Sequence, residues 1–313
     1  MASDFATDDT VALGDQGASS SNQLAAGRLR PGDVLDRYVV EALLGAGGMA
    51  EVYRARDQRL GRAVALKLVR PVQEGDACGT LCSLLMREAR TLATLSNPGI
   101  LTVHDVGEHG GCVYLAMELI DGTTLREWAG SVSDWRERLR GLIEVGVALE
   151  AAHRAKVVHR DIKPDNVLIA RSGRVVVSDF GVARSLADLD DQGHQCGCAG
   201  GATVRVELEG KIVGTPHYMS PEQHQGLAAD SRSDQFSFAV TCWEILHRAL
   251  PFAGNDIVSI RNQVLAYLIQ PVPPHSDVPE AVSNALRRGM RQSPSARYPN
   301  MQTFTEALQR AAG

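Results

Sequence analysis

The sequence is poor in the features that mark several classes of protein. Its 313 residues include six cysteines, too few for a fold held together by disulfides. The longest run without Asp, Glu, Lys or Arg, residues 262–276, contains three prolines and is shorter than the about 20 apolar residues of a membrane span. Basic side chains number 32 against 37 acidic ones. We therefore expect no disulfide framework, no membrane span and no nucleic-acid partner.

The first residues also lack the basic start and apolar run of a secretory signal, which predicts a cytoplasmic protein. Residues 1–32 are rich in Ala, Ser, Gly, Asp and Gln, and the only charges before Arg28 are aspartates, which give −4 of the total net charge of −5. Such a composition cannot offset the entropy lost on ordering. It predicts a disordered acidic tail over residues 1–32.

The rest of the chain has the composition of a globular protein, since 44% of all residues are hydrophobic and 22% are charged. Its length predicts two domains or lobes. In the first part, apolar residues at spacings of three and four over residues 80–95 predict one helix. Short β-branched and apolar runs predict antiparallel strands. These runs are residues 38–44, 51–55, 63–69, 100–106 and 112–119.

The second part is mainly helical by its periodicity. The predicted helices are residues 135–155, 231–250, 256–268, 279–289 and 301–311. Together the patterns predict an α+β chain with a small, mainly β lobe over residues 33–118 and a larger, mainly α lobe over residues 119–313.

Two features of the small lobe suggest a site for an anion. Residues 45–52 read Gly-Ala-Gly-Gly-Met-Ala-Glu-Val between two predicted strands, where glycines let the backbone turn tightly over a phosphate. A plain hairpin turn is an equal alternative for this run. Lys67 lies on an apolar strand and needs a carboxylate or a phosphate as partner, and Glu88 on the following helix is the natural one. Taken singly, each could instead be a surface charge.

A third cluster is far more specific. Residues 159–166 read His-Arg-Asp-Ile-Lys-Pro-Asp-Asn, and Asp179-Phe180-Gly181 follows. A carboxylate can orient a hydroxyl and accept its proton, a lysine can neutralise phosphate charge, and an amide with a second carboxylate can hold Mg2+. Three ordered motifs of this kind predict phosphoryl transfer.

With these motifs the chain resembles, over residues 34–311, the bacterial eukaryotic-like (Hanks-type) serine/threonine protein kinases. The segment Gly-Thr-Pro-His-Tyr-Met-Ser-Pro-Glu at residues 214–222 adds to the resemblance. It implies a bilobal protein-kinase fold and transfer of the γ-phosphoryl of ATP to Ser or Thr hydroxyls of protein substrates, including the enzyme itself. Mg2+, which Mn2+ could replace, would be the metal, and a homodimer could serve autophosphorylation.

The resemblance also implies a role for each matching residue. Asp161 would receive the substrate hydroxyl, Lys163 indicates Ser/Thr acceptors, and Lys67 would hold the ATP phosphates and pair with Glu88. Asn166 and Asp179 would hold the metal. The nucleotide would lie against Leu44, Gly45, Ala46, Gly47 and Gly48 of the glycine loop, Val52, Ala65 and Leu168 around adenine, Met117 as gatekeeper, and Glu118 and Ile120 of the hinge. Leu92, His159 and Phe180 would stack between the lobes, and Glu222 would pair with Arg297.

The sequence departs from the family pattern at a few positions. Ala50, Ser220 and Ala239 replace two glycines and an alanine without removing a catalytic group. Glu207 and Glu209 stand where relatives often have threonines, whose phosphates would carry about −1.5 to −2 charge. We hypothesise that Glu209, or less readily Glu207, partly substitutes for such a phosphate, with a solvated loop charge as the alternative.

Several residues suggest chemistry that simpler explanations cover. His194, Cys196 and Cys198 offer three zinc donors, but no fourth ligand is evident, so unpaired thiols are favoured. Cys78 and Cys82 are expected to pack as small hydrophobes. The alternating series Arg136, Arg138 and Arg140 is expected to form a solvated helical face.

Two other functions remain open at this point. A pseudokinase scaffold usually lacks the phosphate lysine, the catalytic aspartate or the metal aspartate, and all three are present here. A small-molecule phosphotransferase would share an aspartate and an asparagine in its catalytic loop. Residues 214–222, which would form a platform for a peptide around Thr215, argue against that alternative.

Overall fold

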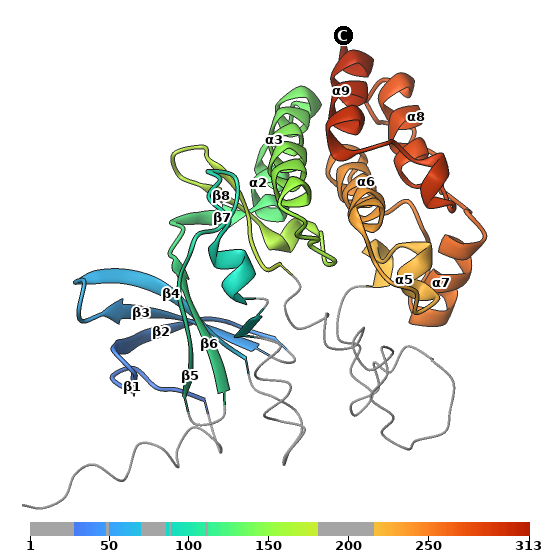
Figure 1. Cartoon of the computed structure of the whole chain (residues 1–313). Coiled ribbons are helices and arrows are strands. Elements are labelled where there is room, and N and C mark those ends of the chain that lie inside the picture. The colour runs from blue at the N-terminus through green and yellow to red at the C-terminus, as the bar shows by residue number, and fades with distance from the viewer. Residues whose placement is uncertain (1–27, 48–49, 70–85, 88, 110–111, 181–215) are drawn as a thin grey trace, which may run out of the picture.

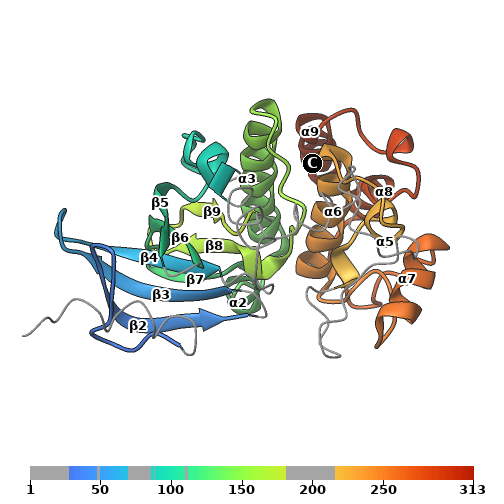
Figure 2. The same ribbon diagram turned by 60° about the horizontal axis from the view of Figure 1, so that its bottom comes forward.

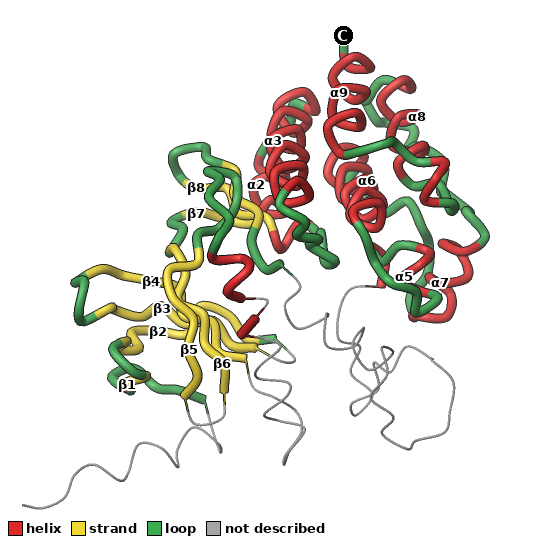
Figure 3. The backbone as a smooth tube through the Cα atoms, in the orientation of Figure 1, coloured by secondary structure: helices red, strands yellow, loops and turns green. Residues whose placement is uncertain are grey.

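The computed structural model describes residues 28–47, 50–69, 86–87, 89–109, 112–180 and 216–313. Most strands lie in one lobe and most helices in the other, as the colouring by secondary structure shows (Figure 3). Several sequence predictions fall outside these residues. They concern the tail up to residue 27, Gly48, Cys78, Cys82, Glu88, Gly181, His194, Cys196, Cys198, Glu207, Glu209, Gly214 and Thr215.

The small lobe is a six-stranded antiparallel sheet in the order β1-β2-β3-β4-β6-β5. All five strands predicted from the sequence are present, and β1 is an additional short one. Residues 86–87 and 89–93 are helical, which agrees with the end of the predicted helix. The strands are β1 (Val34–Leu35), β2 (Tyr38–Ala46), β3 (Ala50–Asp57), β4 (Arg62–Val69), β5 (Val103–His109) and β6 (Cys112–Glu118).

Both faces of the central strands are buried, which explains why these segments read as continuous apolar runs. On β6, Cys112, Tyr114 and Ala116 join one hydrophobic cluster, and Val113, Leu115 and Met117 join another on the opposite face. The second cluster also includes Val176 of the large lobe. Apolar packing therefore continues from the sheet into the junction between the lobes.

The residues just before β1 lie against the same sheet. The backbone N–H of Leu29 donates to the hydroxyl of Tyr53 at 3.1 Å, and Arg28 pairs with Glu51 at 3.1 Å. Leu29 also packs against the cluster that contains Tyr53. Residues 28–32 were predicted as the end of the tail, and these contacts attach Arg28 and Leu29 to the lobe.

The large lobe is built from helices around one apolar core, and each predicted helix is present within a few residues of its expected bounds. In both views α3 lies between the strands and the helices α5 to α9 (Figures 1 and 2). Side-chain caps mark the helix starts, such as Asp134 before α3 and Asp230 before α6. The helices are α2 (Leu125–Ser131), α3 (Trp135–Arg154), α5 (Pro221–His224), α6 (Ser231–His247), α7 (Ile257–Leu265), α8 (Glu280–Gly289) and α9 (Met301–Ala312).

A small antiparallel sheet next to α3 was not predicted from the sequence. It has the order β7-β8-β9 and is formed by β7 (Gly122–Thr124), β8 (Val167–Ala170) and β9 (Val175–Val177). The short turns η1 (Pro164–Asn166) and η2 (Pro216–Tyr218) precede β8 and α5. Because β8 begins directly after η1, this sheet fixes where residues 159–166 can lie.

One prediction for α3 is wrong. Arg138 does not belong to a solvated face, because it is only 6% exposed and its Nη1 donates to the backbone oxygen of Ile245 at 2.7 Å. Arg138 lies three residues after Trp135 and therefore on the same, inward face of the helix. Arg136 and Arg140 are exposed, as expected.

In the part of the chain that the structure describes, no helix has the length and apolar character of a membrane span.

Candidate active site

The segment that carries Asp161 is anchored by a buried carboxylate of α6. Asp234 is fully buried and accepts the backbone N–H of His159 at 2.8 Å and that of Arg160 at 2.8 Å. The ring nitrogen Nε2 of His153, from α3, lies 2.7 Å from the same carboxylate. Arg160 has a positive φ of 67°, a conformation that these two hydrogen bonds stabilise. The loop is therefore attached directly to the core of the large lobe.

His159 joins this loop to the segment that contains Asp179. Its Nδ1 accepts the N–H of Asp161 at 3.2 Å, so its Nε2, 2.8 Å from the backbone oxygen of Ser178, must be the protonated nitrogen. Burial lowers the pKa of His159, which agrees with this neutral form. Its ring lies against Phe180 with 4.5 Å between centroids. Leu92, the third member of the expected stack, lines a cavity together with Phe180.

Two of the predicted catalytic residues, Asp161 and Lys163, and the predicted metal ligand Asn166 contact one another. Lys163 Nζ lies 2.9 Å from Asp161 Oδ2, and the amide nitrogen of Asn166 donates to the same oxygen at 3.1 Å and to the backbone oxygen of Asp161 at 2.7 Å. The backbone oxygen of Asn166 in turn accepts from the N–H and the hydroxyl of Ser178, at 2.8 and 3.0 Å. Asp161 is therefore held in one orientation.

Lys67 reaches across from the small lobe to Asp179. The two side chains form an ion pair of 2.9 Å, which links β4 of the small lobe to the large lobe. Burial raises the pKa of Asp179, but the charge and hydrogen bond of Lys67 outweigh it, so the pKa lies below its ordinary value. Asp179 also has a positive φ of 55°. The expected partner Glu88 lies outside the described residues, so its pairing with Lys67 stays a prediction.

Two side-chain oxygen atoms, one of Asn166 and one of Asp179, are suitable ligands for a hard cation. Asn166 donates through its nitrogen, which leaves Oδ1 as an acceptor, and Lys67 bonds only one carboxylate oxygen of Asp179. Mg2+ prefers such oxygen ligands, keeps several waters and is usually held by one or two protein groups together with phosphates. Among the described residues there is no group of three or more His, Cys, Asp or Glu that could hold a metal. A metal held by Asn166 and Asp179 would share its coordination sphere with phosphates and waters.

The residues expected around adenine meet at the junction of the lobes. Ala65 and Met117 are buried in one cluster, against which Val52, Ile120 and Leu168 pack. Leu44, Gly45, Ala46 and Gly47 lie at the exposed end of β2, and Leu44 is 52% exposed. The carboxylate of Glu118 pairs with Arg174, and its N–H donates to the backbone oxygen of Thr102 at 2.9 Å. Next to this cluster a cavity of about 70 Å3 extends past Lys67 to Phe180.

Sequence reasoning missed one polar network beside the catalytic loop. Arg126 of α2 binds both carboxylate oxygens of Asp165 at 2.9 Å, Glu244 of α6 at 2.5 Å and the hydroxyl of Tyr218 at 3.0 Å. Tyr218 also donates to Glu244. The hydrogen bonds of Arg126 lower the pKa of Asp165, and burial together with Glu244 raises that of Tyr218. No local pattern could reveal this network, because its members come from four separate segments.

The predicted pair of Glu222 and Arg297 is confirmed. Arg297 donates to both carboxylate oxygens of Glu222, at 2.7 and 2.8 Å, and Ser233 donates to the first of them at 2.7 Å. Arg297 is 1% exposed and also donates to backbone oxygens, including that of Arg291. Burial raises the pKa of Glu222, but Arg297 lowers it more. The pair joins the start of α5 to the turn before α9.

We expect Glu222→Gln to lower the free energy of unfolding by about 3 kcal/mol, because it leaves a buried guanidinium without its carboxylate. In the wild-type protein the contribution of Glu222 is complete above the ordinary pKa of a glutamate and is lost as pH falls through its lowered pKa in the folded state. Urea unfolding at several pH values would measure both effects. An equal acid dependence in the variant and the wild-type protein would contradict this assignment.

A comparison with models of protein families shows to which family the chain belongs. A family model described as "Protein kinase domain" matches residues 38–310. The chain belongs to the protein kinase family. The bilobal α+β kinase fold expected from the sequence is thereby confirmed, and so is the resemblance to the bacterial serine/threonine kinases of this family.

Individual relatives place the chain among these bacterial kinases. It is 35% identical over 278 residues to the serine/threonine-protein kinase PknB of Mycolicibacterium smegmatis, covering 86% of this chain and 42% of the relative. It is 34% identical over 280 residues to PknA of Mycobacterium tuberculosis, covering 87% of this chain and 60% of the relative. The chain thus spans about half the length of these relatives. The solved kinase domain of Mycobacterium tuberculosis PknI matches with a TM-score of 0.67 and 25% identity, over 91% of this chain and 100% of that one.

Proposed function

We propose that this chain is a serine/threonine protein kinase that transfers the γ-phosphoryl group of Mg-ATP to Ser and Thr hydroxyls of protein substrates, including itself. The observation that carries the proposal is the set of contacts that joins Asp161, Lys163 and Asn166 in one loop and pairs Lys67 with Asp179 opposite them. Relatives that are named serine/threonine-protein kinases support it.

In this proposal Asp161 orients the acceptor hydroxyl and takes its proton. Its Oδ2 is fixed by Lys163 and Asn166, so the carboxylate loses little freedom when a substrate binds. Lys163 places a positive charge beside that carboxylate, where it can stabilise negative charge on the phosphoryl group being transferred. Mg-ATP, when bound, supplies the phosphoryl group and the charge neutralisation of its oxygens.

The remaining residues would bind and position the nucleotide. Lys67 would hold the phosphates, Asn166 and Asp179 would hold Mg2+ or Mn2+, and the apolar cluster around Ala65 and Met117 would receive adenine. The glycine loop, with Gly48 outside the described residues, would cover the phosphates. A cytoplasmic location and a homodimer that phosphorylates itself stay predictions from the sequence and its resemblance.

Incubating the protein with radiolabelled ATP and Mg2+ tests the proposed function. We expect label to enter the protein itself and a generic basic protein, with phosphoserine and phosphothreonine as products. Label in a sugar or an aminoglycoside instead of the proteins would favour a small-molecule phosphotransferase. Nucleotide binding without transfer would favour a pseudokinase.

The network around Arg126 predicts a positioning role beside the chemistry. We expect Arg126→Met to lower kcat about tenfold, because Asp165 and Glu244 lose their shared cation next to Asn166. Arg126→Lys should restore part of kcat, since a single charge remains while the two-point contact with Asp165 is lost. Steady-state kinetics with a peptide substrate would measure kcat and KM separately.

The matched control for this prediction is Arg154→Met. Arg154 is a more exposed arginine that pairs with Glu150 within α3 and also donates to Gln302 of α9. Its replacement should leave kcat unchanged. Equal kcat values for the Arg126→Met variant and the wild-type enzyme would show that the network does not position the loop.

A further inference from the structure

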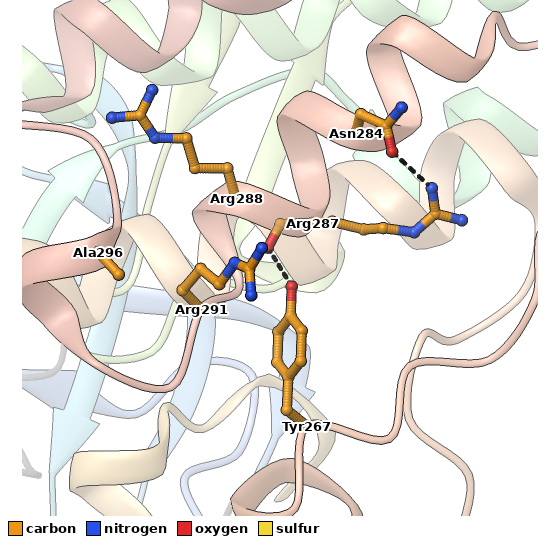
Figure 4. Close-up of a pocket in the computed structure, with 6 residues that line it drawn as sticks. All are labelled: Tyr267, Asn284, Arg287, Arg288, Arg291 and Ala296. Carbon is orange, nitrogen blue, oxygen red and sulfur yellow. Dashed lines mark hydrogen bonds between the residues drawn. The ribbon is translucent and has the colours of Figure 1, made fainter.

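A second cavity lies in the large lobe and is lined by none of the residues assigned above to catalysis. Its volume is about 580 Å3, within the roughly 300–1,000 Å3 that is usual for small-molecule sites. Figure 4 shows the side chains around it, which come from α8, the segment that follows α8 and the segment after α7. They are Tyr267, Asn284, Arg287, Arg288, Arg291 and Ala296.

Two of its three arginines form no ion pair with the residues that the structure describes. Arg287 forms an ion pair with Glu280 at 2.6 Å and a hydrogen bond with Asn284 at 2.9 Å. For Arg288 and Arg291, by contrast, the described part of the chain offers no carboxylate within ion-pair distance, and both side chains are exposed. Within the described part of the chain, the cavity therefore has an excess of positive charge.

Aromatic rings hold these two guanidinium groups in place. The guanidinium carbon of Arg288 lies 4.3 Å from the ring centroid of Tyr298, and that of Arg291 lies 5.2 Å from the ring centroid of Tyr267. A guanidinium over a ring keeps its N–H groups available at its edge, and it loses less freedom on binding than a mobile side chain does. Both arginines are thus oriented before any ligand arrives.

The frame that carries the arginines is itself fixed by hydrogen bonds. The hydroxyl of Tyr267 donates to the backbone oxygen of Arg287 at 2.7 Å, and Tyr267 has a positive φ of 55°, which a bulky residue rarely adopts. The backbone oxygen of Arg291 accepts from Nε of the buried Arg297 at 2.8 Å. The side-chain amide of Gln292 donates to the backbone oxygen of Leu265. Two sides of the cavity are therefore tied together.

Stabilisation of the helix terminus accounts for only part of this arrangement. Arg288 lies in the last turn of α8, where a cation interacts favourably with the helix dipole. Arg291 follows the end of the helix at Gly289, and its guanidinium lies over the ring of Tyr267 from the segment after α7. Neither the helix dipole nor an ion pair with a described residue explains why both arginines line one cavity.

We propose that Arg288 and Arg291 bind the phosphate group of a phosphate monoester carried on a larger molecule, such as a phosphorylated serine of a peptide. Guanidinium groups form paired, charge-assisted hydrogen bonds with phosphate oxygens. Tyr267 and Ala296 provide apolar surface for the atoms next to the phosphate. The proposal does not depend on the kinase activity, because it concerns binding at a separate site.

Fluorescence anisotropy with the full chain, without ATP or metal, tests this site. A labelled phosphoserine peptide should bind saturably and at least about tenfold more tightly than its unphosphorylated form. The double variant R288Q/R291Q should lose this difference, with an unchanged circular dichroism spectrum because both side chains are exposed. Competition with free phosphoserine and with inorganic phosphate would separate the two sources of the anion. If either competes as well as the peptide, the site takes small phosphate anions.

The matched control is R310Q, which removes an exposed arginine of α9 whose nearest carboxylate, that of Glu306, lies 3.9 Å away. This variant should bind the phosphopeptide as the wild-type chain does. Equal binding of the two peptides, or full phosphopeptide binding by R288Q/R291Q, would overturn the proposal. Either result would leave the proposed kinase activity unaffected, since phosphoryl transfer is measured separately.

Discussion

Replacing Asp161 by Asn is expected to lower the rate of phosphoryl transfer by a factor of about 10² to 10⁴, the usual contribution of a general base. The variant keeps the size of the side chain but removes the group that would take the hydroxyl proton. It also removes the charge that pairs with Lys163 at 2.9 Å. Label transferred from ATP to a basic protein under single-turnover conditions would measure the loss.

The fold of this variant should be intact, because the loop keeps the hydrogen bonds between Asp234 and the backbone of His159 and Arg160. Asp121→Asn provides the control, since Asp121 is a surface carboxylate, 77% exposed, that pairs with Arg171. It should transfer phosphate at the wild-type rate. An active Asp161→Asn enzyme would remove Asp161 from its assigned role and the proposed mechanism with it.

Lys67→Met should reduce kcat by about 10² to 10³, comparable with the loss of one charged or hydrogen-bonding group that stabilises a transition state. The methionine fits the apolar strand but leaves Asp179 without its ion pair of 2.9 Å. Since the charge of Lys67 lowers the pKa of Asp179, the variant should also raise that pKa. The activity that remains should therefore fall at a higher pH than in the wild-type enzyme as the solution is acidified.

A pH profile of kcat for the two proteins checks this second expectation. Lys156→Met, in the exposed turn after α3, is the control for loss of a lysine, and its profile should match that of the wild-type protein. Lys67→Arg tests the geometry, because a guanidinium keeps the charge but does not reproduce the compact ammonium group. Wild-type activity in Lys67→Met would exclude a catalytic role for the ion pair.

Local periodicity predicted the elements of this protein well where the apolar pattern was long. The helix over residues 135–155 is observed as Trp135–Arg154, because its buried residues repeat at spacings of three and four. The three-stranded sheet β7-β8-β9 was not predicted, because β7 and β9 have three residues each, which is too few for a periodic pattern. For Arg138 the prediction of a solvated position was wrong. Its charge suggested contact with solvent, although its spacing of three from Trp135 places it on the buried face of the helix.

The residues of the candidate site could be predicted from the sequence, but the residues that hold the catalytic loop in place could not. The motifs around Asp161 and Asp179 named the groups that the structure brings together. Arg126, however, is 39 residues from Asp165 and 118 from Glu244, and only the fold reveals that they meet. The burial of Asp234 beneath the loop likewise depends on how α6 packs, which no local pattern specifies.

The attachment of the catalytic loop to Asp234 has a consequence for thermal inactivation. Loops that carry function usually open at a small fraction of the free energy of global unfolding. Here two backbone N–H groups of the loop donate to the fully buried carboxylate of Asp234 in α6, so the loop cannot move away without breaking both hydrogen bonds to a buried charge. Heating should therefore abolish catalysis together with the cooperative melting of the large lobe, with no range of temperature in which a folded lobe carries a displaced loop.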